Sequence, residues 1–192
     1  MFYNLVLISL LNNKHFAMLQ IHRKLFSIVI CSYFLISVHC LNISGIWEED
    51  SAQRVGFSQM ADAVGMFSVQ QRIASFWKWS KTISILQNGI EFEASEISGL
   101  SDKRSDYYLT ADNKTVDEKL LLDFGGEDFT KPILVKVVSE IKGDTLIQYM
   151  KYQSSPTFDF VESRSISGDS MTATLKNLKH NVQMSSFYKR KL

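Results

Sequence analysis

The C-terminal third of the chain alternates apolar and polar positions in five segments of strand length. Short turns rich in Gly, Asp, Ser and Asn separate them, for example at residues 142–144 and 167–170. A period of two fits these segments better than the 3.6-residue period of a helix, and strands joined by such turns are typical of an antiparallel up-and-down meander. The five predicted strands are residues 133–141, 145–152, 157–166, 171–178 and 182–189.

The third of these strands carries an arginine on its more apolar face. Alternate side chains of a strand point the same way, so Phe158, Phe160, Glu162, Arg164 and Ile166 share one face. Arg164 is then either a charge paired with Glu162, two residues away, or a charged anchor inside an apolar cavity. Parity alone leaves both interpretations open.

The preceding part of the chain predicts a further five strands and one helical region. The strands are residues 44–48, 81–87, 90–97, 104–110 and 117–124. Between the first two, Phe57, Met60, Ala61 and Val64 form one apolar helical face. Gly65 interrupts this pattern and residues 66–74 resume it, which predicts two short amphipathic helices that pack against an all-β domain of ten strands.

The first forty residues differ from the rest because they contain no Asp or Glu. Basic residues 22–24 precede the apolar run 25–38, and a cleavage site at residues 38–40 follows. This order is typical of a secretory signal, and the run is short for a membrane span. We therefore predict a signal in residues 1–40, with Met18 as an alternative start, and a mature domain of residues 41–192. An uncleaved N-terminal anchor is the alternative.

Removing this segment leaves the domain with few residues that could bind a metal ion or act as a nucleophile. Both cysteines, Cys31 and Cys40, leave with it, and only His180 stays. No zinc site or Cys/His pair can then be built, and no nucleophile, base and orienting group stand together, so we predict neither an enzyme nor a metal or cofactor. Three of the 21 basic residues leave and all 20 acidic ones stay, giving a net charge near −2, which argues against nucleic acid as a partner.

Secretion would also expose two candidate glycosylation sequons. They begin at Asn42 and Asn113 and read Asn-Ile-Ser and Asn-Lys-Thr.

Several stretches resemble the fatty acid-binding proteins, of the intracellular lipid-binding family, in the secreted form found in nematodes. They are Gly45-Ile46-Trp47 and residues 57–65, 71–74, 83–89, 146–148 and 158–166. The resemblance covers residues 43–190, although 98–131 cannot be placed uniquely. It implies a calycin-like, ten-stranded antiparallel up-and-down β-barrel of two five-stranded sheets, capped by a two-helix lid, with one lipid in an internal cavity.

The resemblance also implies a ligand site. Arg164 falls on the family's buried arginine, and Tyr188 on the tyrosine of its Arg-x-Tyr pair, but Ser186 replaces the arginine of that pair. The remaining predicted ligand-binding residues are Glu162, Phe160, Met150, Gln148, Met184, Phe57 and Met60.

These features predict a secreted, monomeric carrier of a fatty acid or retinoid, which exchanges its ligand with membranes or with a lipid donor or acceptor. Two alternatives stay open: a true lipocalin, which also begins with Gly-x-Trp, and an extracellular interaction module whose barrel holds no ligand.

Export gives the first testable expectation. Protein recovered from the medium of secreting cells should begin near Leu41 and contain no thiol, because both cysteines lie in the predicted signal. N-terminal sequencing and thiol titration measure this. Secreted protein that still carries residues 25–38 would contradict it.

Overall fold

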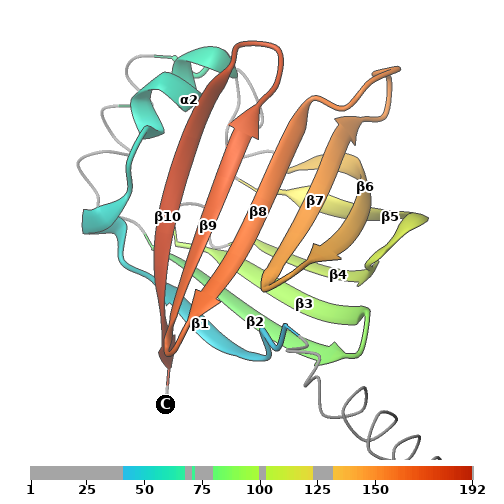
Figure 1. Cartoon of the computed structure of the whole chain (residues 1–192). Helices are drawn as coiled ribbons and strands as arrows, with labels where there is room; N and C mark the ends of the chain where they lie inside the picture. The colour runs from blue at the N-terminus through green and yellow to red at the C-terminus, as the bar shows by residue number, and fades with distance from the viewer. Residues whose placement is uncertain (1–40, 68–70, 72–79, 100–102, 123–131, 192) are drawn as a thin grey trace, which may run out of the picture. The chain divides into compact units, whose positions relative to one another are not determined.

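The computed structural model describes residues 41–67, 71, 80–99, 103–122 and 132–191. They form ten antiparallel strands in the order β4-β3-β2-β1-β10-β9-β8-β7-β6-β5, a meander curled into a nearly closed barrel (Figure 1). The strands are β1 (Gly45–Glu49), β2 (Lys81–Asn88), β3 (Glu91–Ser98), β4 (Arg104–Thr110), β5 (Asp112–Leu121), β6 (Ile133–Lys142), β7 (Thr145–Tyr152), β8 (Phe160–Ser167), β9 (Ser170–Asn177) and β10 (Val182–Lys191). The predicted ten-stranded antiparallel barrel is confirmed.

The first and last strands join the barrel together. Trp47 of β1 lies opposite Arg190 of β10 on one side and Ile83 of β2 on the other. The ten strands consequently form one continuous sheet, and the expected division into two five-stranded sheets is wrong. Strands β4 and β5 stand at the two ends of the order, and among the described residues no ladder of backbone hydrogen bonds joins them.

Most predicted strand limits agree with the structure to within about one residue, as expected where alternation is clear. The largest differences are in β5, which starts at Asp112 rather than 117, and in β8, which starts at Phe160 rather than 157. Before β8, the Asp159 carboxylate accepts a hydrogen bond from the Tyr152 backbone N–H at 2.9 Å. Phe158 lies before the strand and is 40% exposed, so its predicted place on the strand face shared with Arg164 is wrong.

One helix of the predicted lid lies within the described residues. Helix α2 (Phe57–Ala63) lies beside β10 (Figure 1), and a short 3-10 turn, η1 (Ser51–Gln53), precedes it. Met60 and Ala61 are buried, while Phe57 and Val64 pack against the core, as the helical pattern predicts. The second predicted helix falls largely outside the described residues. No helix of the described part is long and apolar enough to cross a membrane.

The residues at the start of the domain are buried and hydrogen-bonded to the barrel. Trp47 is fully buried, and its Nε1 donates to the Ile43 carbonyl at 2.9 Å. The Gln87 side chain holds the start of the domain, because Oε1 accepts from Ile43 N at 2.9 Å and Nε2 donates to the Leu41 carbonyl at 2.6 Å. The chain is therefore anchored into the barrel from Leu41.

Two glycines at the ends of α2 provide a matched stability test. Gly56 and Gly65 have similar positive φ angles of +79° and +78°. A Cβ added at Gly56 would lie 2.2 Å from the Gln183 carbonyl oxygen, whereas a Cβ added at Gly65 would have no heavy atom within 4 Å. Gly65→Ala should cost about 1–2 kcal/mol of backbone strain. Gly56→Ala should cost roughly 1–3 kcal/mol more because β10 must shift.

Urea unfolding of the two variants measures this difference. Equal losses would show that α2 does not depend on its close contact with β10.

Candidate functional site

Five polar residues, four of them buried and Glu162 partly buried, meet inside the barrel, and we call them the internal charge cluster. They are Glu96 on β3, Tyr107 on β4, Lys119 on β5, and Glu162 and Arg164 on β8. Arg164 and Lys119 are each 2% exposed and Glu96 is 3% exposed. Charged side chains are almost never buried unless paired, so the partners of each group decide what this cluster can do.

Arg164 uses its whole guanidinium within the cluster. Nη2 donates to Glu96 Oε1 at 2.5 Å and to both carboxylate oxygens of Glu162 at 3.1 and 3.2 Å. Nε also donates to Glu162 Oε1 at 3.2 Å, and Nη1 donates to the Tyr107 hydroxyl at 3.2 Å. Of the two sequence-based interpretations, the structure therefore contains the pair with Glu162 and adds Glu96 as a second carboxylate.

Lys119 connects the same carboxylates from the opposite side. Its Nζ donates to Glu162 Oε2 at 3.1 Å and to Gln148 Oε1 at 3.2 Å, and lies 3.8 Å from Glu96 Oε1. The ammonium group also lies 5.0 Å from the centre of the Tyr107 ring, a cation–π distance. Each buried carboxylate thus contacts both cations.

The cluster favours the ionised form of its two carboxyl groups. Burial alone would raise the pKa of Glu96, but the charges of Lys119 and Arg164 outweigh it and lower that pKa well below its ordinary value of 4.5. The pKa of Glu162 is lowered in the same way, mainly by Arg164 and Lys119 against burial. Their stabilising contribution is therefore present above about pH 4.5 and is lost as the pH falls through the lowered values.

A second ion pair lies at the edge of the cluster. Arg54 Nε donates to Glu49 Oε1 at 2.8 Å and Nη2 donates to Oε2 at 2.5 Å, with both side chains largely buried. The backbone N–H of Lys81 donates to the same Glu49 oxygen at 3.1 Å, and Lys81 Nζ lies 3.9 Å from Glu96 Oε2. Glu49 therefore ties η1 and the start of β2 to the barrel interior.

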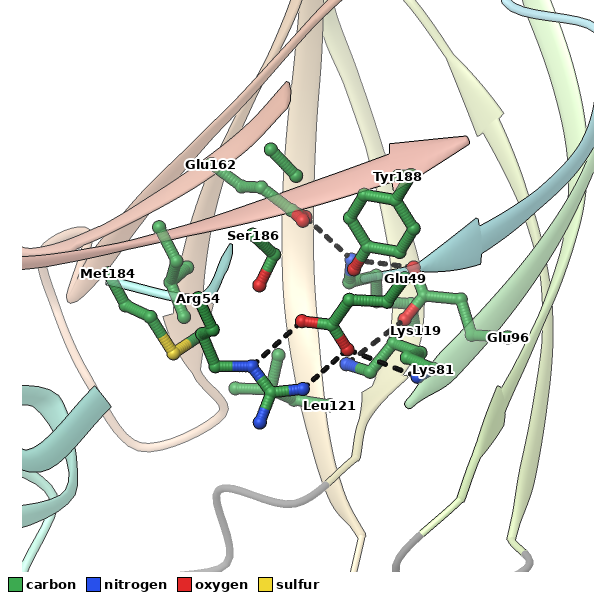
Figure 2. Close-up of a pocket in the computed structure, with 12 residues that line it drawn as sticks. Glu49, Arg54, Lys81, Glu96, Lys119, Leu121, Glu162, Met184, Ser186 and Tyr188 are labelled. Carbon is green, nitrogen blue, oxygen red and sulfur yellow. Dashed lines mark hydrogen bonds and ion pairs between the residues drawn. The ribbon is translucent and has the colours of Figure 1, made fainter. Parts of the chain in front are cut away.

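A cavity of about 30 Å³ opens between these groups, enough for roughly two water molecules. Figure 2 shows charged side chains from several strands converging on it. It is lined by Glu49, Arg54, Lys81, Glu96, Lys119, Leu121, Glu162, Ala173, Leu175, Met184, Ser186 and Tyr188. The lining therefore combines charged side chains with apolar side chains and hydroxyls.

The structure brings all the predicted ligand-binding residues into the barrel interior or its helical cover, but only some reach this cavity. Glu162, Met184, Ser186 and Tyr188 line it, while Arg164 lies behind Glu162 and Glu96. The other predicted residues are buried or partly buried in the core: Phe160, Met150, Gln148, Met60 and Phe57. Burial and the nearby Glu49 carboxylate raise the pKa of Tyr188, which keeps its hydroxyl protonated.

The two candidate glycosylation sites lie on the surface. Asn42 and Asn113 are both exposed. Whether either carries a glycan stays a prediction.

Sequence reasoning missed several members of the site, although a signal for some of them exists. Glu96 has the same parity as Phe92 and Ala94 on β3, and these two apolar residues are buried. Lys119 likewise shares a face with Leu121 on β5. Applying the parity rule to β3 would have placed Glu96 inside, whereas both faces of β5 carry apolar residues and parity does not assign Lys119.

The cluster also bridges the strands that lack a backbone ladder. Lys119 of β5 contacts the ring of Tyr107 on β4, and Arg164 of β8 donates to its hydroxyl. Nearer the surface, Asp117 of β5 accepts a hydrogen bond from the Thr110 backbone N–H of β4 at 2.7 Å. Side chains thus replace backbone hydrogen bonds in closing the barrel.

A search of the described residues for groups of three or more His, Cys, Asp or Glu side chains arranged to hold a metal ion found none. The cluster itself offers fixed charges and hydrogen bonds beside a small cavity.

The fold is similar to that of solved lipid carriers. It matches the REP1-NXSQ fatty acid transporter with a TM-score of 0.57 and 20% identity over 78% of this chain and 96% of that one. It matches fatty-acid-binding protein 1 of Echinococcus granulosus with a TM-score of 0.57 and 12% identity over 78% of this chain and 98% of that one. These proteins are named for fatty acid transport and binding, and at such low identity the likeness shows the fold alone.

Comparison at the level of sequence gives no further relatives. No family model matches the chain, and a search of the curated proteins found no match.

Two arginines allow the stabilising role of the cluster to be measured. Arg164→Gln leaves Glu96 and Glu162 buried with one cation fewer, so it should lower the free energy of unfolding by about 3–5 kcal/mol. Arg104→Gln removes the exposed Arg104–Asp106 pair, whose side chains are each 62% exposed, and should leave the free energy of unfolding nearly unchanged because solvent screens the pair. Denaturant unfolding at pH 7 measures the free energy of unfolding of both variants. If Arg164→Gln lowered it no more than Arg104→Gln does, the internal charge cluster would not stabilise the fold.

Proposed function

We propose that this chain is a non-enzymatic carrier that binds a small hydrophobic ligand, of the size of a fatty acid or retinoid, inside its barrel. One observation carries the proposal: a ten-stranded barrel with the fold of a fatty acid transporter has a cavity lined by both charged and apolar side chains. Such a lining suits a molecule with a polar head and a long apolar tail.

Burial of the tail would supply most of the affinity. A sixteen-carbon chain has some fourteen methylenes at roughly 0.8 kcal/mol each, about 11 kcal/mol before the costs of binding. A charge-assisted hydrogen bond to the head adds only about 1.5–3 kcal/mol. The polar wall would therefore orient the ligand and choose its head group, while the apolar interior would hold it.

The interior must rearrange to accept such a ligand, because pockets for molecules of this size are roughly 300–1,000 Å³ and the cavity beside the cluster is about 30 Å³. The described part of the chain contains five methionines, and all of them are buried: Met60, Met66, Met150, Met171 and Met184. Methionine side chains are unbranched and adapt to irregular spaces. They give the core a means of making room without breaking the barrel.

We also propose that the carrier acts outside the cell and exchanges its ligand with membranes or with a lipid donor or acceptor. The support is the signal-like pattern of residues 1–40. The exposure of Asn42 and Asn113 is compatible with glycosylation during export.

A second candidate is an interaction module whose barrel holds no ligand. The small cavity and the mutual pairing of its charged wall favour this alternative. The true lipocalin is less suitable, because ten strands are described here and an up-and-down lipocalin barrel has eight.

Extraction of lipid from the purified protein distinguishes the two candidates. Protein secreted by eukaryotic cells and purified without added lipid should release about one lipid molecule per chain into organic solvent, identified by mass spectrometry. Protein unfolded and refolded in lipid-free buffer serves as the control and should release none. An empty barrel that also fails to take up a fluorescent lipid would favour the interaction module.

A further inference from the structure

The wall of the cavity presents equal numbers of opposite charges. Among the described lining residues, the carboxylates of Glu49, Glu96 and Glu162 face the cations of Arg54, Lys81 and Lys119 (Figure 2). Arg164 is not part of this lining. A ligand that enters the cavity therefore meets a polar wall without excess positive charge.

Arg164 is the residue that a ligand carboxylate would be expected to reach, but two protein carboxylates already occupy that place. The Glu162 carboxylate receives donors from Nε and Nη2 at 3.1–3.2 Å, and Glu96 receives Nη2 at 2.5 Å. Lys119, the neighbouring cation, holds the other Glu162 oxygen at 3.1 Å. An acid could bind Arg164 closely only by displacing Glu162 or Glu96.

We propose that the barrel takes ligands with an uncharged, hydroxyl-bearing head, such as a long-chain alcohol, in preference to the corresponding carboxylic acid, and that Glu162 sets this preference. The inference rests on the proposed carrier function and narrows its ligand class. The Glu162 carboxylate neutralises Arg164 and Lys119, and it occupies the position beside them that the carboxylate of an acidic ligand would need.

The physical reason is the cost of a buried charge without a partner. A bound acid would add a fourth carboxylate to a wall that already holds three, and a displaced Glu162 would stay in the interior without its two cations. A hydroxyl head brings no charge. It can donate to a wall carboxylate, which still has acceptor capacity, and can accept from a neighbouring donor such as the Ser186 hydroxyl.

Side-by-side titration with hexadecanol and hexadecanoic acid at pH 8 tests the preference. The wild-type protein, delipidated and measured by displacement of a neutral fluorescent lipid, should bind the alcohol at least about ten-fold more tightly than the acid. Glu162→Gln keeps the shape of the side chain but removes its charge. It should tighten binding of the acid by about ten-fold and change that of the alcohol by less than about three-fold.

Glu93→Gln is the matched control, because Glu93 is exposed on the outer face of β3 and its replacement changes the net charge equally. It should leave both affinities unchanged. A gain for the acid in this variant too would assign the effect to overall charge and overturn the role of Glu162.

The remaining outcomes separate the two proposals. Wild-type protein that binds neither ligand would refute the carrier function itself. Tighter binding of the acid than of the alcohol by wild-type protein would overturn the head-group preference and leave the carrier function intact. This wild-type comparison decides the matter even where Glu162→Gln does not fold.

Discussion

The barrel depends on burying opposite charges in mutual contact. Arg164 and Lys119 lie among Glu96 and Glu162 in an interior from which water is largely excluded, so each charge is tolerated only because the others are present. The same contacts join β3, β4, β5 and β8, including the two strands that no described backbone ladder connects. The cluster thus both closes the barrel and forms the polar part of the cavity lining. A ligand can therefore bind only if the contacts that close the barrel are kept.

The fold was largely predictable from the sequence because the turns and the alternation of β6 to β10 are strong local signals. The exceptions occur where a local hydrogen bond competes with the pattern, as at Asp159, whose capping of Tyr152 delays the start of β8. The site was less predictable. Parity placed Arg164 and Glu162 on the same strand face. Glu96, however, lies 68 positions from its partner Arg164, and Lys119 lies 43 positions from its partner Glu162. Such long-range contacts are determined only when the barrel closes.

The described interior combines a rigid part and an adaptable part. Paired charges have defined geometry and oppose rearrangement, whereas the buried methionines can change rotamer at small cost. Met184 lies on the same strand as Ser186 and Tyr188, so the two parts meet along β10. Helix α2 packs against this strand, and movements that admit a ligand would be transmitted to it directly.

The pairing of β1 with β10 also determines when the domain can be completed during synthesis. β1 is made first and β10 last, and the two lie side by side through contacts such as Trp47 with Arg190. A pairing so distant in sequence carries a high loop-closure cost and forms slowly. Until β10 has left the ribosome, β1 has a partner on one side only, and the emerging chain exposes an unpaired strand edge, which favours aggregation.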